Sequence, residues 1–477
     1  MQRVYLIVTG LLVLLALFGS CRRDDDFITD NTADLRFSED TVLFDTVFTT
    51  VGSTTEWLKV YNRFNKPIQI ASISLANGNS SNFRINVDGV SGRVFSDIEI
   101  PAEDSIFIFV EVTVDPNGGT TPLIITDNLV FETNGNVQEI ELVAWGQDAY
   151  FYPNVLFGDE QVYQLPSDKP NVFYGLAIID SNSRLIIPEG TQLHFHKGAG
   201  IVAGRASTLE VNGTAANPVV FQGDRLEEEW QDVPGQWGVI FGGAPRGGIW
   251  LTATSRDHVI NHAVIKNSDI GIQVDSVGSL SSPTLTMESV TVINNSGVGL
   301  LAQGSWVEAK NCVFANAGNY VVALNIGGVK YLFEHCTFAN YWRFGSRNTG
   351  MLLLNNFFKI RDDVFIRDLN NTVFSNCIIE GSASEELETQ NDAAGAFDYF
   401  FDRCILRTEK ATTNANRFAD IIRNPGTQVF ADPLEGDFRL YVNSPAVDEG
   451  KLINVLLDIE GNTRDGQPDL GAYEFIP

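Results

Sequence analysis

A short phrase returns seven times between residues 263 and 404 at nearly constant spacing, reading AVIKN, SVTVINN, NCVFAN, HCTFAN, NNFFK, NCIIEG and RCIL. Its equivalent positions are Ala263, Val290, Cys312, Cys336, Asn356, Cys377 and Cys404. They are 20 to 27 residues apart, a period typical of solenoids. Because the repeats are rich in Val, Ile, Phe and Asn and lack a helical i, i+3, i+4 pattern, they predict short strands and turns. The expected fold is a parallel β-helix, since the Leu-x-x-Leu-x-Leu phrase of the leucine-rich repeat is absent.

The composition agrees with an all-β protein. The 477-residue chain contains 32 Phe and 42 Gly but only 3 Met, and it lacks long helix-forming stretches beyond its N-terminus. Its formal net charge of −28 would repel phosphate backbones, which argues against nucleic acid as a partner. Acidic glycans would also be repelled overall, although local basic patches could override that average.

Residues 1–20 predict a secretory signal peptide. Arg3 lies before the apolar stretch 4–18, and Gly19 and Ser20 provide small residues before Cys21. The apolar stretch is shorter than the roughly 20 residues that span a bilayer. The sequence LFGSC resembles the lipobox of bacterial lipoproteins, which implies that Cys21 is lipidated and that the protein is held at a membrane by its lipid. An ordinary cleaved signal with a chance cysteine is the alternative.

Residues 21–34 are expected to form an acidic tether. The run Arg22-Arg23-Asp24-Asp25-Asp26 is typical of a solvated terminal segment. It also resembles the acidic signal that directs some Gram-negative lipoproteins to the outer face of the outer membrane. This resemblance implies a cell-envelope protein that is exposed at the cell surface.

Residues 35–149 predict a β-sandwich. Short alternating strands are separated by turn signals such as Asn65-Lys66-Pro67 and Asn134-Gly135, and about seven strands over this length are typical of a sandwich. The phrases LKVYN (58–62), PIQI (67–70) and DSIFIFV (104–110) resemble immunoglobulin-like domains of secreted bacterial proteins. We expect a spacer without a ligand, because no residues in this domain converge as a site.

The remainder predicts a junction and N-terminal cap at 150–183, a β-helix at 184–440 and a C-terminal cap at 441–477. The phrases IPEGTQLHF, LEVNGT, PVVF and WGVIF resemble the opening turns of right-handed parallel β-helix proteins. The final phrases SPAVDEG and DIEGNTRDGQPDLGAYE resemble the choice-of-anchor Q motif that often follows β-helices in bacterial surface proteins. Both ends of such a stack need caps that block edge pairing.

Cysteine, histidine and aspartate residues are the candidates for a metal or catalytic site. The repeat cysteines are interpreted as free, buried thiols, with disulfides between neighbouring repeats as the alternative. The five histidines lack the partners of a catalytic triad and are assigned to turns or the surface. Asp458, Asp465 and Asp469 could hold Ca²⁺, but a turn closed by Asx hydrogen bonds is the commoner outcome. No cofactor and no other metal site are predicted.

The segment from Asn340 to Asn348 is the best candidate for binding. Aromatic rings stack on sugar faces, and Arg can add bidentate hydrogen bonds to carboxylate or sulfate. The candidate residues are Tyr341, Trp342, Arg343, Arg347 and Lys359. The alternative is a loop whose aromatic rings pack back on the solenoid.

The leading functional hypothesis is a lipid-anchored envelope protein that presents its β-helix for glycan binding or adhesion. The first alternative is a polysaccharide lyase or glycoside hydrolase that uses the surface from Tyr341 to Lys359. The second is a non-catalytic scaffold or protein-interaction module. The expected partners are the membrane, through the lipid, and a polysaccharide or a surface protein.

Overall fold

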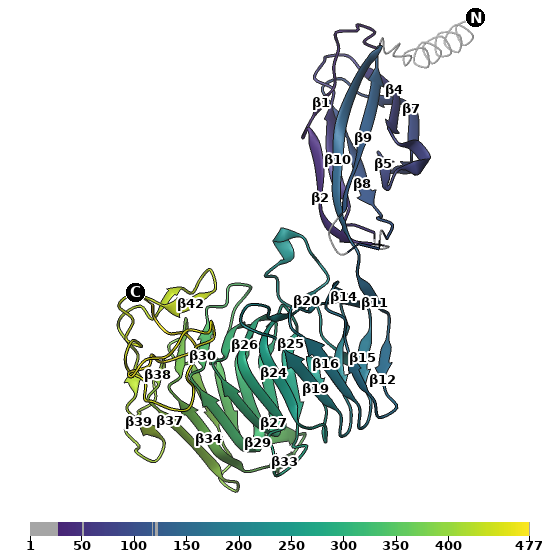
Figure 1. Ribbon diagram of the computed structural model, residues 1–477. Coiled ribbons are helices and arrows are strands. Elements are labelled where there is room, and N and C mark those ends of the chain that lie inside the picture. The colour runs from purple at the N-terminus through teal and green to yellow at the C-terminus, as the bar shows by residue number, and fades with distance from the viewer. Residues whose placement is uncertain (1–26, 50–51, 117, 120–122, 477) are drawn as a thin grey trace, which may run out of the picture. The chain divides into compact units, whose positions relative to one another are not determined.

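The chain forms two compact units, residues 1–148 and 149–477, both built from strands (Figure 1). The structure is a computed structural model that describes residues 27–49, 52–116, 118–119 and 123–476. Its only helices within these residues are two 3₁₀ turns, Gly78–Ser80 and Glu228–Trp230. The all-β prediction is therefore confirmed. The predicted signal peptide and Cys21 lie outside the described residues.

The first unit is a sandwich of two five-stranded sheets, ordered β1-β3-β8-β5-β6 and β2-β10-β9-β4-β7. Alternate side chains such as Ile106, Ile108 and Val110 point into the core, as a pleated strand requires. This arrangement confirms the predicted immunoglobulin-like sandwich. The strands are β1 (Arg36–Phe37), β2 (Thr41–Phe48), β3 (Glu56–Tyr61), β4 (Ile68–Leu75), β5 (Phe83–Val87), β6 (Val90–Gly92), β7 (Val94–Ile100), β8 (Ser105–Val112), β9 (Leu123–Thr133) and β10 (Asn136–Gln147).

The described end of the predicted tether, residues 27–34, contacts the sandwich at its two ends and is exposed at residues 29–32. Ile28 packs against the core, and Ala33 is part of it. The backbone N–H of Ile28 donates to the carbonyl of Pro67 at 3.0 Å. Two apolar side chains thus hold this otherwise polar segment against the sandwich.

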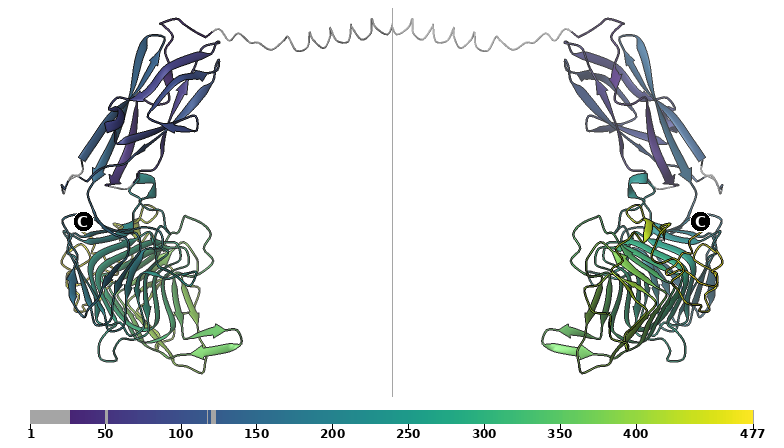
Figure 2. Two further views of the ribbon diagram at one scale, coloured as in Figure 1. Left: turned by 90° about the vertical axis from the view of Figure 1, so that its right-hand side faces the viewer. Right: turned by 90° about the vertical axis from the view of Figure 1, so that its left-hand side faces the viewer.

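The second unit is a parallel β-helix whose turns each contribute a strand to three faces (Figures 1 and 2). Face 1 contains β11 (Tyr150–Tyr152), β14 (Asn171–Phe173), β17 (Gln192–Phe195), β20 (Val219–Gly223), β28 (Val313–Ala317), β30 (Thr337–Asn340), β35 (Ile378–Gly381), β38 (Ile405–Leu406) and β40 (Ile422–Arg423). Face 2 contains β12 (Val155–Phe157), β15 (Leu176–Ile179), β18 (Gly200–Ala203), β23 (Gly247–Leu251), β25 (Ile270–Asp275), β31 (Leu352–Asn355) and β36 (Leu387–Gln390). Face 3 contains β13 (Val162–Gln164), β16 (Arg184–Pro188), β19 (Thr208–Asn212), β34 (Leu369–Ser375), β37 (Phe397–Asp402) and β39 (Phe418–Ala419).

Four long strands bend around a corner and so belong to two faces. β24 (His258–Lys266) and β26 (Leu285–Asn295) run from face 3 into face 1, whereas β27 (Val298–Lys310) and β29 (Tyr320–Glu334) run from face 2 into face 3. The parallel pairing between equivalent segments of successive turns continues through these bends.

The corner between faces 3 and 1 explains the sequence repeat. In six successive turns it holds a non-glycine residue with φ between +44° and +54°, a left-handed conformation that sharply redirects the chain. These residues are His262, Ser289, Asn311, His335, Asn376 and Arg403. The residue after each corner is buried, and in four turns it is a free cysteine, which confirms the interpretation of these residues as buried thiols.

Two of the expected boundaries differ from the structure. Residues 150–183 were expected to form a junction and cap, but β11, β12 and β13 pair in parallel with β14, β15 and β16 as a complete first turn. The expected C-terminal cap begins at residue 441, whereas the segment that covers face 1 already includes Val429 and Phe430. Its apolar residues Phe430, Phe438 and Leu470 cover outward-facing side chains of the later turns of face 1, such as Ile378, because these turns are apolar on both sides.

We expect Phe374→Ala to destabilise the β-helix by about 3–5 kcal/mol, because it leaves a cavity within a column of buried rings. Phe374 stacks on Phe333 at 5.0 Å and on Phe401 at 4.5 Å between ring centroids. The urea-unfolding midpoint of the β-helix transition measures this loss. Phe365→Ala, at an exposed ring, is the matched control. Equal midpoints for the two variants would contradict the role of the column.

Candidate functional site

The outer surface of face 2 is hollowed into a cleft of about 380 Å³, called here the Asp275 cleft. Its floor is formed by neighbouring parallel strands, because Trp250 of β23 pairs in register with Gln273 of β25, and Asp275 with Gln303 of β27. Its sides are formed by Phe241, Arg246 and Arg367. The side chains that line the cleft therefore come from segments more than a hundred residues apart.

Asp275 is the centre of the hydrogen-bond network in the cleft. Its carboxylate accepts the indole N–H of Trp250 at 2.7 Å, the Gln303 amide at 2.8 Å and the Gln273 amide at 3.0 Å. The Gln273 carbonyl oxygen in turn accepts the backbone N–H of Gly247 at 3.0 Å. This network fixes the orientation of one aromatic ring and two amides, and three donors occupy the carboxylate.

A short hairpin places a second aromatic ring beside Trp250. Strands β21 (Ile240–Phe241) and β22 (Ala244–Pro245) are joined by Gly242 and Gly243, whose φ values of +61° and +75° favour glycine. The ring of the exposed Phe241 lies 5.6 Å from that of Trp250. The two rings give the cleft an apolar wall next to its polar floor.

Two arginines add positive charge to a protein with a net charge of −28. The guanidinium of Arg246 lies 5.7 Å from the Trp250 ring centroid, and its buried Nε has no partner among the described residues. The guanidinium of Arg367 packs directly against Gly304. A Cβ atom at residue 304 would lie only 2.6 Å from Nη1 of Arg367. Both groups can therefore donate hydrogen bonds to a ligand.

The predicted candidates Tyr341, Trp342 and Arg343 lie together in the loop between β30 and β31, away from the Asp275 cleft. Tyr341 packs edge-on to Phe430 of the C-terminal segment, and burial raises its pKa. Trp342 contacts Phe344. Arg343 donates to the carbonyl of Leu434 at 3.2 Å and lies 3.6 Å from a Glu435 carboxylate oxygen.

Arg347 forms a buried bidentate ion pair with Glu386. Both Nη1–Oε2 and Nη2–Oε1 measure 2.6 Å, and the two side chains are 5% and 0% exposed. The Glu386 carboxylate can be buried because Arg347 neutralises it. Arg347 is engaged within the fold and does not face a ligand.

Lys359 lies apart from the other candidates. It belongs to the hairpin of β32 (Phe357–Ile360) and β33 (Asp363–Ile366), which projects from the β-helix in Figure 2. The loop of Arg343 precedes β31 and this hairpin follows it, so a four-residue strand, about 13 Å long, separates them. The structure therefore does not bring the five predicted residues into one site.

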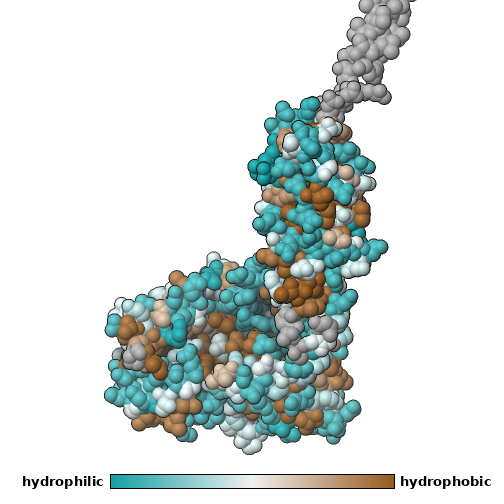
Figure 3. Space-filling model, turned by 45° about the horizontal axis from the view of Figure 1, so that its top comes forward, coloured by the Kyte–Doolittle hydropathy of each residue, from teal (hydrophilic) through white to brown (hydrophobic). Residues whose placement is uncertain are grey.

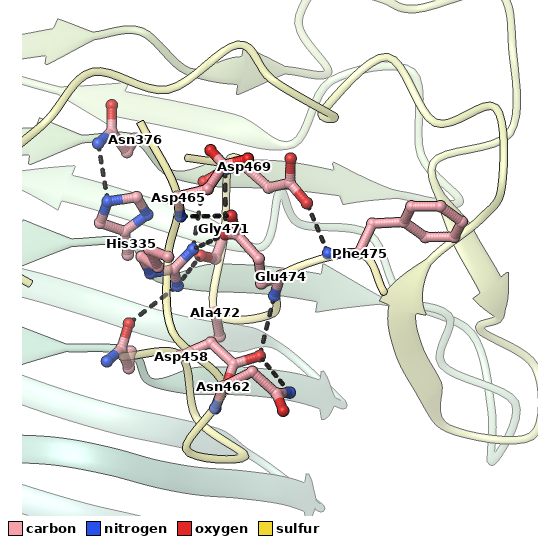
Figure 4. Close-up of polar contacts among 12 residues, drawn as sticks. His335, Asn376, Asp458, Asn462, Asp465, Asp469, Gly471, Ala472, Glu474 and Phe475 are labelled. Atoms are coloured by element: carbon pink, nitrogen blue, oxygen red, sulfur yellow. Dashed lines mark hydrogen bonds and ion pairs between the residues drawn. The ribbon is translucent and has the colours of Figure 1, made fainter. Parts of the chain in front are cut away.

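The C-terminal aspartates use their oxygens to close turns. Asp458 accepts the backbone N–H groups of Asn462 at 2.7 Å and Glu474 at 3.0 Å, and Asp469 accepts that of Phe475 at 2.6 Å (Figure 4). Asp465 accepts the backbone N–H of Gln467. This is the predicted Asx alternative to a Ca²⁺ site, and no cluster of metal-binding side chains occurs within the described residues.

Two of the histidines, His258 and His335, are buried, and His335 lies in a corner, in agreement with its assignment to a turn. His258 accepts the backbone N–H of Leu209 at 2.9 Å, and burial lowers its pKa to about 3. His335 lies 2.9 Å from the amide of Asn376 (Figure 4), and burial likewise lowers its pKa to about 3. Both rings are neutral and support corners of the β-helix, so neither is poised as a general acid or base.

The sequence reasoning missed every residue of the Asp275 cleft, although one signal was present. Asp275, Gln303 and Asn325 each follow an apolar strand segment, in the phrases GIQVD, GLLAQ and VVALN. In the structure these three residues pair in register on successive turns. A polar residue that recurs at one slot of a solenoid predicts a continuous polar column on its surface.

Comparison with known proteins confirms the fold of the second unit. Residues 170–338 match the family model described as right handed beta helix region. No curated protein matches the chain.

Solved structures with similar segments include a protein of unknown function from Porphyromonas gingivalis W83 (12% identity, TM-score 0.18), a family 123 glycoside hydrolase from Clostridium perfringens (9%, 0.17) and the periplasmic chaperone SfaE (17%, 0.17). They cover 25%, 24% and 24% of this chain, which spans 59%, 25% and 58% of theirs. Similarities of this size carry no functional information.

We expect Arg347→Ala to destabilise the β-helix by about 3–5 kcal/mol, because it leaves the Glu386 carboxylate buried without its cation. Arg343→Ala removes an exposed pair and should cost about 1 kcal/mol or less. Urea unfolding of both variants measures the difference. A loss of ligand binding by Arg347→Ala without loss of stability would contradict this assignment.

Proposed function

We propose that this protein is a lipid-anchored component of the bacterial cell envelope whose β-helix binds a glycan in the Asp275 cleft. The observation that carries the proposal is the arrangement around Asp275, which holds the Trp250 indole and the amides of Gln273 and Gln303 in fixed positions. A sugar ring has apolar C–H faces and a polar rim. An aromatic wall beside fixed amides matches both.

The size and charge of the cleft agree with this proposal. Its volume of about 380 Å³ lies within the usual range of small-ligand sites. Arg246 and Arg367 make it a local positive patch on an acidic protein. Such a patch overcomes the overall repulsion of acidic glycans at short range, because salt screens the more distant charges.

A polysaccharide lyase is the second candidate, favoured by these same arginines. A lyase must neutralise a uronate carboxylate and remove a proton, and Arg246 and Arg367 could provide the neutralising charge. Hydrolysis is less well supported, because it requires two carboxyl groups. Among the described residues that line the cleft, Asp275 is the one carboxylate, and three donors already occupy it.

The membrane attachment is proposed from Cys21 and its lipobox. Within the described residues, no helix has the length and apolar character of a membrane span. The lipid would therefore be the anchor of these two units. Attachment by several acyl chains would be stable, whereas a single chain binds only marginally.

We expect Trp250→Ala to weaken glycan binding at least about tenfold, the equivalent of about 1.4 kcal/mol, because it removes the ring that stacks on the sugar. The full-length protein would be titrated with a panel of acidic and neutral polysaccharides, and unsaturated-product absorbance would be recorded in parallel. Trp306→Ala is the matched control, because Trp306 lies on face 3 and bonds to Glu308.

Equal binding by these two tryptophan variants would overturn the assignment of the Asp275 cleft. Binding with no new absorbance supports glycan capture. An absorbance that grows with time and disappears in Arg246→Ala would establish the lyase instead.

We expect Cys21→Ser to release the protein from membranes, because the thiol is the site of lipid attachment in the proposed lipoprotein. Carbonate-washed membranes from cells expressing either form would be compared by immunoblotting. Continued association of Cys21→Ser with washed membranes would refute the lipid anchor. Protease added to intact cells would test whether the two units are exposed at the cell surface.

A further inference from the structure

The sandwich carries a row of exposed aromatic rings on the outer face of the sheet that contains β3, β8 and β5. Trp57, Phe107 and Phe109 are 49%, 41% and 40% exposed. The ring of Phe107 lies 5.8 Å from that of Trp57 and 6.2 Å from that of Phe109. We call these three residues the aromatic platform. Hydrophobic residues gather in patches on the surface of this unit in Figure 3. Exposed apolar patches commonly mark binding sites.

The register of the strands explains why the platform forms. Trp57 pairs with Phe109, and Phe109 pairs with Asn86 of β5. Because side chains alternate along a strand, residues paired across strands share a face. The platform is therefore built on two adjacent central strands, β3 and β8, and does not depend on a loop.

A cavity of about 600 Å³ opens at the Phe109 end of the platform. It is lined by polar and charged side chains around this one ring, including Arg84, Asn86, Ser91, Arg93 and Glu111. A hollow of this volume on a flat sheet is large enough for one or two sugar units. The cavity thus adds a polar rim to an apolar platform.

Several polar groups of the rim are left available. The Oδ1 atom of Asn86 is buried and has no partner among the described residues. Arg84 and Glu111 pair in register across the strands, yet no ion pair joins them, and Arg84 makes no side-chain hydrogen bond within the described part of the chain. A buried acceptor without a partner is costly, so a ligand that donates to it would be stabilised.

We propose that this face of the sandwich is a second saccharide-binding site, which takes a neutral oligosaccharide with one sugar ring stacked on Phe109. Hydroxyl groups of the sugar would donate to Asn86 Oδ1 and Glu111 and accept from Arg84. A hydroxyl both donates and accepts, so a neutral sugar satisfies the cation and the carboxylate together.

The platform is better suited to a saccharide than to an added peptide strand. A peptide strand would pair with backbone N–H and C=O groups at a sheet edge, whereas this site presents side chains from the middle of a face. The site is also independent of the Asp275 cleft, which lies in the other unit. Its role as a site does not require that the cleft binds glycans.

Four variants of the full-length protein test the proposal. Trp250→Ala is introduced first in every protein, so that binding in the Asp275 cleft is suppressed. In this background, Phe109→Leu keeps apolar volume but removes the ring, and Phe109→Tyr keeps the ring. Cellohexaose, mannohexaose, xylohexaose and laminarihexaose are the probes, and binding is measured by calorimetry and by saturation transfer from protein to sugar in NMR.

We expect the Trp250→Ala protein to bind at least one probe, Phe109→Tyr to bind it within about twofold, and Phe109→Leu to bind it at least about tenfold more weakly. Arg84→Met in the Trp250→Ala background should bind the same probe more weakly than the Trp250→Ala protein does. The thermal unfolding of the sandwich should not change. The proposal is overturned by absence of binding to all four probes, or by equal binding of the Leu and Tyr variants. It is also overturned if the face binds a protein partner but no sugar.

Discussion

The β-helix depends on the in-register stacking of its turns, and in six successive turns from His262 to Arg403 a left-handed residue forms the corner of faces 3 and 1. The corner turns the chain at the same point in each repeat, so equivalent residues lie directly above one another. Inward-facing side chains at equivalent positions of successive turns then form columns of like residues. The stacked rings of Phe333, Phe374 and Phe401 are one such column. Aromatic columns add contact energy beyond burial, and the same stacking aligns the polar slots outside.

The three faces have different outer surfaces, and this difference decides where a ligand can bind. In its later turns, face 1 is apolar on its outside and is covered by the C-terminal segment. Gly471 makes this contact possible, because its N–H reaches the carbonyl of Asn376 at 2.8 Å and an added Cβ would lie 2.7 Å from Ile378. Arg464 joins the same contact through Asn311, at 3.0 Å. Face 2 carries polar slots instead, and its Asp275 cleft stays open.

The fold of the second unit was predictable because a short phrase recurs in the sequence with the period of one turn. The first turn was missed, since residues 150–183 are aromatic-rich and do not contain the phrase. The candidate site was misplaced for a different reason. A loop rich in aromatic and basic residues resembles a binding site, but the partner of Arg347 lies 39 residues further along the chain. Whether an arginine is free or paired is decided by the stacking of turns, which a linear pattern does not show.

Insertions at the corners convert a regular face into a site. The β21–β22 hairpin enters between faces 1 and 2 and brings Phe241 and Arg246 to one side of the cleft. The β32–β33 hairpin enters between faces 2 and 3, and Arg367 follows it on the other side. The floor between them is common solenoid structure, with Asp275 and Gln303 at one slot. Specificity is therefore expected to lie in the two hairpins, because they can vary in length and sequence without disturbing the stacked core.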